Sequence, residues 1–111
     1  MVTEQAAVSE LLDCGRVDWV SLQDVVWYST HGDVNPESQS LAMSVLRRLF
    51  CEGLMVPGDL GETGFEDWLG TVEDWLDRAW AQLEFFGWAP MGDGFWLRMT
   101  DRGRELSEAS S

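Results

Sequence analysis

The segment Phe65–Phe86 constrains the fold most strongly, because its polar and apolar residues recur with the period of one long α-helix. At about 100° per residue, the side chains of Glu73, Asp77 and Glu84 point within roughly 20° of the direction of Glu66. This acidic file consists of Glu66, Glu73, Asp77 and Glu84, and Asp67 and Asp74 widen it. The opposite face carries Trp68, Val72, Trp75, Leu76, Ala79, Leu83 and Phe86. The pattern predicts a helix with one side in a core and an acidic side facing a cationic partner.

Trp80 lies on the border between the apolar and acidic faces of this predicted helix. A tryptophan beside carboxylates is typical of an interface hot spot, where an aromatic anchor is surrounded by polar contacts. The predicted partner-binding residues are Glu66, Asp67, Glu73, Asp74, Asp77, Trp80 and Glu84. The alternative is a solvated acidic face that only keeps the protein in solution.

Charge limits the partners that such a surface suits. The sequence has 20 acidic and 7 basic residues and a net charge of -13, which repels the phosphates of DNA and RNA. A cationic protein fits this charge better than a nucleic acid does. The acidity is concentrated, since the segment 59–77 contains no basic residue. A composition without Lys or Ile, as a GC-rich genome produces, is the alternative origin of the charge.

Length and composition predict one compact domain. The 111 residues, 45% of them hydrophobic, suffice for a single core but not for two domains of ordinary size. We expect residues 1–106 to form this domain and the Ser-rich end, 107–111, to be disordered. Cys14 and Cys51 are too few for a disulfide framework. With no signal peptide and no apolar run of roughly 18 residues, we expect a cytoplasmic protein that does not enter a membrane.

Capping signals and apolar spacing predict three helices in the first half of the chain. They cover residues 2–13, 22–29 and 36–52. The third has the clearest start, because Asn35 is a favourable N-cap and Pro36 a favourable first residue. An apolar stripe then continues to a glycine that suits the end of a helix.

The second half combines strands with the acidic helix. Thr63 and Glu66 have the spacing of a capping box at the start of that helix. Short β-prone runs lie at 17–20, 54–56 and 95–99, and a last short helix is expected after residue 100. The predicted fold class is mainly α with a small β-sheet (α+β). We interpret the order as a winged-helix-like single domain, with the extra amphipathic helix where the wing would otherwise be a tight hairpin.

Signals for catalysis and for metal binding are weak. His31 beside Asp33 is the only histidine, and no serine has the surroundings of a G-x-S-x-G nucleophile elbow. The carboxylates of Glu73, Asp74 and Asp77 suit a solvated helix face better than a calcium or magnesium site. We therefore predict no enzymatic activity, no catalytic residue, no cofactor and no metal ligand.

Two stretches resemble known proteins. The run FWLRMTDRGREL at Phe95–Leu106 resembles the closing strand and helix start of many bacterial winged-helix proteins. The run GLMVPGDL at Gly53–Leu60, together with Gly64, Phe65 and that ending, is similar to a group of small acidic actinobacterial proteins. Several of those proteins lie beside toxin genes and are thought to be immunity proteins. The resemblance implies a winged-helix fold and a role as a toxin inhibitor.

The leading hypothesis is a non-enzymatic immunity protein whose acidic helix covers the basic active-site cleft of a toxin, in particular a nuclease. A winged-helix transcriptional regulator that binds DNA or a ligand is the first alternative, and it requires arginines to converge on one face. Those arginines are Arg47, Arg48, Arg98, Arg102 and Arg104. The second alternative is an anti-defence protein whose carboxylates imitate the phosphates of DNA.

Overall fold

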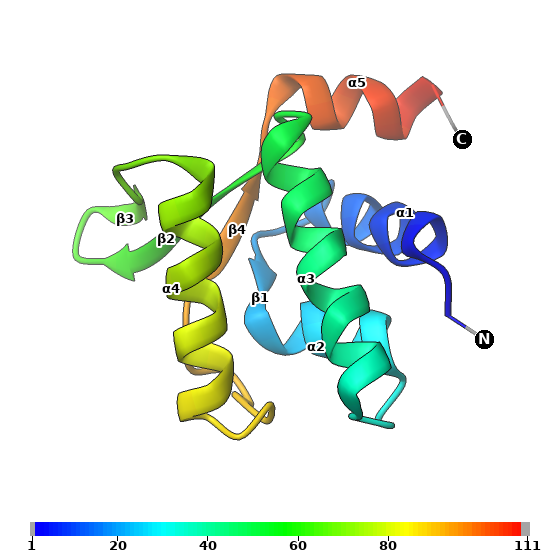
Figure 1. Cartoon of the computed structure of the whole chain (residues 1–111). Coiled ribbons are helices and arrows are strands. Elements are labelled where there is room, and N and C mark those ends of the chain that lie inside the picture. Colours follow the sequence, from blue (N-terminus) through cyan, green and yellow to red (C-terminus); the bar gives the residue numbers. More distant parts are fainter. Residues whose placement is uncertain (1, 110–111) are drawn as a thin grey trace.

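The structure is a computed structural model that describes residues 2–109. Within this range the chain forms five helices and a four-stranded antiparallel sheet, which confirms the predicted α+β class (Figure 1). The helices are α1 (Glu4–Gly15), α2 (Leu22–Thr30), α3 (Pro36–Cys51), α4 (Val72–Phe85) and α5 (Asp101–Ala109). The strands are β1 (Val20–Ser21), β2 (Met55–Gly61), β3 (Gly64–Asp67) and β4 (Trp96–Met99).

The first three helices lie where the sequence predicts them, and side-chain caps fix where α2 and α3 begin. Ser21 and Asp24 form a capping box at α2, in which each side chain bonds to the other residue's backbone N–H. Asn35 and Ser38 form the equivalent pair at α3, with Pro36 at its first residue. Both starts satisfy backbone donors that a helix otherwise leaves unpaired.

The predicted start of the acidic helix is wrong. Gly64–Asp67 is strand β3, and α4 begins only at Val72, after the N-cap Thr71. Gly64 has φ +101° and Gly70 has φ +105°, so the backbone leaves the helical region on both sides of β3. The Thr63 hydroxyl instead donates to the Glu66 carboxylate, at 3.0 Å, within the β2–β3 turn.

The sheet has the order β1-β4-β2-β3, and every neighbouring pair is antiparallel. Met55 of β2 is opposite Met99 of β4, and both side chains lie close to Gly15 of α1. Helices α1 and α3 therefore cover this face of the sheet (Figure 1). The other face carries Trp19, Phe65 and Arg98, with the Trp19 and Phe65 ring centroids 5.6 Å apart.

Helix α4 packs against α3 through its apolar face. Leu76, Ala79 and Leu83 are buried, as the sequence predicts for Leu83. Trp75 is half-buried and meets Phe50 of α3 edge to face, with ring centroids 5.4 Å apart. These contacts fix which side of α4 faces solvent.

The end of the chain is more ordered than predicted. Helix α5 continues to Ala109 and buries Ser107, so the expected disordered segment 107–111 is helical at its start. Residues 110 and 111 lie outside the described part of the chain. Among the residues that the structure describes, no helix has both the length and the apolar character needed to cross a bilayer.

Candidate partner-binding surface

The outward face of α4 keeps part of the predicted acidic file. Glu73, Asp77 and Glu84 are all exposed on this helix, along the side next to the buried Leu76 and Leu83. Within residues 2–109, neither the Asp77 nor the Glu84 carboxylate has a hydrogen bond or an ion pair. These two carboxylates are therefore free to meet a partner.

Glu73 is committed to a neighbouring helix. Its carboxylate accepts two hydrogen bonds from the Arg47 guanidinium of α3, at 2.7 and 3.4 Å. The hydrogen bond and the positive charge of Arg47 hold the pKa of Glu73 below its usual range. Both side chains stay more than half exposed, so the pair links α3 to α4 at the surface and stabilises the protein only weakly.

Asp74 has a local structural role. One oxygen of its carboxylate accepts the backbone N–H of Thr71 at 3.0 Å, while the Thr71 hydroxyl accepts the backbone N–H of Asp74 at 3.2 Å. This reciprocal pair is the capping box that starts α4, and the negative charge also suits the N-terminal end of the helix dipole.

Glu66 and Asp67 do not belong to the acidic file, because they lie on β3 rather than on α4. The Asp67 carboxylate accepts two hydrogen bonds from the Arg98 guanidinium, at 2.9 and 3.3 Å. Arg98 of β4 lies opposite Val56 of β2, and Asp67 of β3 lies opposite Gly58 of β2. The two side chains therefore lie on the same face of the sheet, on either side of β2. The predicted row of four carboxylates on one helix is thus reduced to three, of which one is paired.

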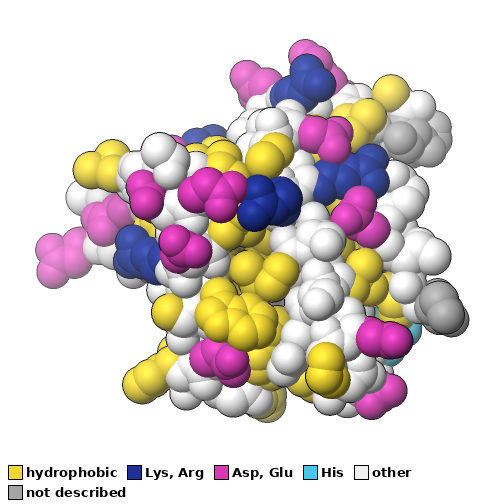
Figure 2. All heavy atoms as spheres, in the orientation of Figure 1, with side chains coloured by type: hydrophobic (Ala, Val, Ile, Leu, Met, Phe, Trp, Pro, Cys, Tyr) yellow, Lys and Arg dark blue, Asp and Glu magenta, His cyan; other side chains and the backbone are white. Residues whose placement is uncertain are grey.

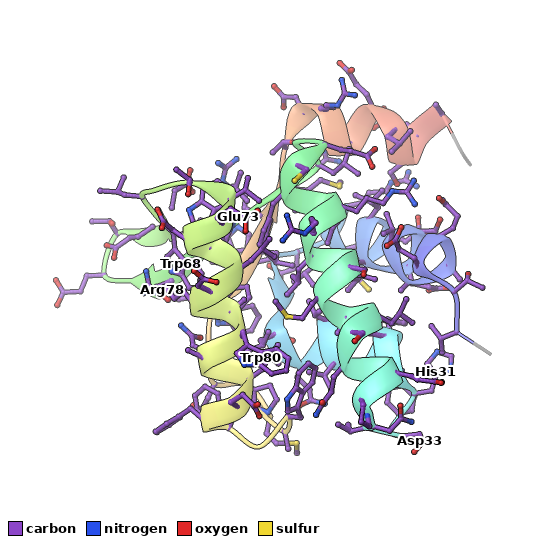
Figure 3. The ribbon with its side chains drawn as sticks, viewed as in Figure 1. His31, Asp33, Trp68, Glu73, Arg78 and Trp80 are labelled. Carbon is purple, nitrogen blue, oxygen red and sulfur yellow. The ribbon has the colours of Figure 1, made fainter. Side chains whose placement is uncertain are left out.

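Trp80 combines support from the core with exposure to solvent. Its side chain is 40% exposed, and its ring lies 5.8 Å from the ring of the buried Trp88 at an angle of 73°. Figure 3 places Trp80 on the side of α4 that faces α3, and Figure 2 shows hydrophobic side chains with carboxylates beside them in this region. The composition predicted for a hot spot is therefore present around Trp80.

Phe85 is a second exposed aromatic residue of α4 that the predicted site does not include. The side chain is 83% exposed, and its ring meets Phe86 edge to face at 5.1 Å. Its position seven residues after Arg78 places both side chains on the same outward side of α4, a signal that the helical period already contained. Phe85 therefore belongs to the side of α4 that carries Arg78 and not to the side that carries Trp80.

A cluster of three side chains beside α4 was also missed. The Trp68 indole N–H donates to Asp59 Oδ2 at 3.0 Å, and Arg78 donates to the same oxygen at 3.2 Å. The Arg78 guanidinium also stacks on the Trp68 ring, 3.9 Å from its centroid, in a cation–π contact. Figure 3 shows Trp68 and Arg78 on the side of α4 away from Trp80. Trp68 comes directly after β3, so its buried position against Arg78 of α4 depends on a strand that the helical pattern did not predict.

A groove of about 500 Å³ adjoins this cluster. Asp59 and Arg78 lie at its polar end, and Phe85 and Phe86 supply aromatic walls. Because Arg78 and Phe85 line it, the groove lies on the side of α4 away from Trp80 and is separate from the acidic residues around Trp80. The exposed side of α4 that carries Asp77, Trp80 and Glu84 is called the α4 surface below.

Three of the five arginines considered for DNA binding are paired with carboxylates. Besides the Arg47–Glu73 and Arg98–Asp67 pairs, Arg48 lies 3.0 Å from Glu52. In Figure 2 the dark blue side chains on the visible face have magenta neighbours. An arginine whose charge is already paired gains less from a phosphate, so these contacts do not favour a phosphate-binding patch.

His31 and Asp33 lie at the end of α2, away from α4 (Figure 3). His31 is the C-cap of α2, with a left-handed backbone conformation, and its ring lies 5.7 Å from that of Trp27. Within residues 2–109, His, Cys, Asp and Glu side chains form no group of three or more that suits a metal ion. Comparisons of the chain with protein-family models, curated proteins and solved structures gave no match.

Proposed function

We propose that this chain is a non-enzymatic, cytoplasmic immunity protein that neutralises a basic toxin, in particular a nuclease, by covering its active-site cleft. The single observation that carries the proposal is the α4 surface, where two carboxylates without partners flank a half-exposed tryptophan. Such a combination of free charge with an aromatic anchor suits recognition of a protein rather than of a small molecule.

Charge and aromatic contact have different roles in this proposal. The net charge of -13 attracts a basic partner over distance and speeds the encounter. Trp80 then excludes water from the contact and slows dissociation. Trp88 supports this role, because its buried ring backs Trp80 and limits the side-chain freedom lost on binding.

The scaffold that we propose is winged-helix-like. Its support is the chain order α1-β1-α2-α3-β2, followed by a later strand, β4, that lies between β1 and β2. In this interpretation α4 is an insertion between β3 and β4. The insertion then supplies the partner-binding surface, while α3 keeps a packing role against α4.

The two alternatives have less support. A DNA-binding regulator needs several free arginines on one face, whereas three of the five candidates, Arg47, Arg48 and Arg98, each have a carboxylate neighbour. A DNA mimic needs a continuous row of free carboxylates, but Glu66 and Asp67 are separated from α4 on a strand. Both would still give complexes that salt weakens, so salt dependence alone does not distinguish them from an immunity protein.

A capture experiment with matched charge reversals tests the proposal. Tagged wild-type protein, the variant Asp77→Lys/Glu84→Lys and the control Glu10→Lys/Glu105→Lys are used to retain proteins from the native host. The control changes the net charge equally on exposed residues of α1 and α5. We expect the wild type and the control to retain a basic protein whose activity they inhibit, and the α4 variant to lose it. Equal retention by all three would contradict the proposal.

A further inference from the structure

Strand β3 forms an open edge of the sheet. In the order β1-β4-β2-β3 it has one neighbour, β2, and in Figure 1 it lies at the outer side of the molecule with no described element beside it. Such an edge exposes backbone donors and acceptors and can accept another strand. We call the outward backbone of Gly64–Asp67 the β3 edge.

The register identifies which groups point outward. Trp68 donates its backbone N–H to the Pro57 carbonyl at 2.9 Å, so positions 57 and 68 are a hydrogen-bonded pair. Because such pairs alternate along an antiparallel ladder, Glu66 also bonds to β2, whereas Phe65 and Asp67 direct their N–H and C=O groups away from it. Outside the ladder with β2, no described residue forms a hydrogen bond with the backbone groups of Phe65 or Asp67.

Charge determines which strand this edge suits. Natural edges carry charged side chains that prevent pairing between copies of the same chain, and Glu66 and Asp67 have this effect here. Residues 49–77 include no Lys or Arg, so a second copy of the chain would bring the same acidic hairpin against this one. A basic strand meets no such repulsion and gains from the nearby carboxylates.

The side chains of β3 define the alternation of the added strand. Phe65 projects to the open face of the sheet, where Trp19 and Leu60 lie beside it, and Leu60 is 45% exposed. Glu66 projects to the other face. An antiparallel strand would therefore place an apolar residue opposite Phe65 and a basic residue opposite Glu66. Leu69, 92% exposed directly after β3, offers further apolar contact.

We propose that the β3 edge binds an extended segment of the partner as a fifth, antiparallel strand, and that this segment alternates basic and apolar residues. Backbone hydrogen bonds from Phe65 and Asp67 would hold the segment, and Glu66 would select its charge. The inference rests on the proposed function, because the basic partner supplies the segment. It adds a second contact region to the α4 surface.

A synthetic peptide in which Lys and Val alternate is the probe. Binding is measured by fluorescence anisotropy, and hydrogen exchange of the Phe65 and Asp67 amides is followed at saturation. We expect binding, with slower exchange at both amides. In the proposed register the valines lie opposite Phe65 and Asp67, so only the valine N–H groups point toward β3.

Backbone methylation of the peptide separates this mode from simple charge attraction. A backbone hydrogen bond contributes roughly a factor of two to ten, so N-methylation at the valines should weaken binding by about tenfold or more. N-methylation at the lysines leaves the bonded edge intact and should have little effect. Equal binding of all three peptides, or no binding of the unmodified one, would overturn the proposal.

Two variants of the protein provide the reciprocal test. Asp67→Pro removes an outward N–H without breaking a β2–β3 bond, whereas Asp67→Ala removes the carboxylate and keeps that N–H. We expect Asp67→Pro to weaken peptide binding by about two- to tenfold more than Asp67→Ala does. If Asp67→Pro does not fold, the methylated peptides on the wild type still decide the outcome.

The outcome is separable from that of the capture experiment. If Asp67→Pro retains the basic protein as well as the wild type does, while the α4 variant loses it, the β3-edge proposal alone is overturned. Peptide binding at β3 without any basic protein retained from the host would contradict the proposed function and leave the edge assignment intact.

Discussion

Replacing Trp75 with alanine tests the orientation of α4 on which the candidate surface depends. Truncating a fully buried Trp costs about 3–5 kcal/mol of unfolding free energy. Trp75 is only half-buried, so part of this value applies. Its contact with Phe50 contributes about 0.5–1.5 kcal/mol, and the hydrogen bond from its indole N–H to the Leu69 carbonyl, 3.2 Å long, a similar amount. We therefore expect Trp75→Ala to lower the unfolding free energy by about 2–3 kcal/mol.

Two further variants make this value interpretable. Trp75→Phe keeps most of the ring but removes the hydrogen bond to Leu69, so it should lose about 1 kcal/mol. Trp80→Ala, at the edge of the same helix next to α3, should also lose only about 1 kcal/mol, since Trp80 is 40% exposed. Equilibrium unfolding in urea measures all three. A loss in Trp80→Ala as large as that in Trp75→Ala would mean that α4 presents a different face to solvent.

Two other predictions concern the links that hold the elements together. Glu73→Gln removes the ion pair with Arg47. Because the pKa of Glu73 is lowered in the folded state, the wild type should be more stable than the variant above the ordinary pKa of 4.5, and this difference should vanish as the pH falls through the lowered pKa. Urea titrations at several pH values measure the difference. Gly103→Ala should lower the unfolding midpoint, because a Cβ at this position would overlap the backbone carbonyl oxygen of Leu54. This overlap should outweigh the helix propensity of alanine, which favours the variant by about 1 kcal/mol. An equal or higher midpoint would show that α5 lies elsewhere.

Much of the fold follows from local signals in the sequence. The caps at Ser21 and Asn35 place α2 and α3, because these side chains act on backbone groups only a few residues away. The apolar side of α4 is equally predictable, since Leu76 and Leu83 recur at helical spacing. These features need no knowledge of distant parts of the chain.

The errors have a local and a long-range source. The carboxylates at 66, 73, 77 and 84 share a helical period, which concealed the local signal of a hairpin in which Gly64–Asp67 pairs with β2 across a tight turn. The pairing of Glu73 with Arg47 and of Asp67 with Arg98 joins residues far apart in sequence, so the periodic pattern could not show which carboxylates are free. The Arg78 contact with Trp68 likewise depends on tertiary structure.

The association rate of the chain with its captured basic partner tests the central claim most directly. The rate constant is measured at low and high salt for the wild type, for Asp77→Lys/Glu84→Lys and for the control Glu10→Lys/Glu105→Lys. Glu73 is left intact because its reversal would also break the pair with Arg47.

We expect salt to slow association of the wild type and of the control to similar extents. The α4 variant should associate more slowly and lose most of this salt dependence, while its unfolding free energy changes by less than about 1 kcal/mol, since both residues are exposed. An unchanged rate and an unchanged salt dependence in the α4 variant would contradict recognition through the α4 surface.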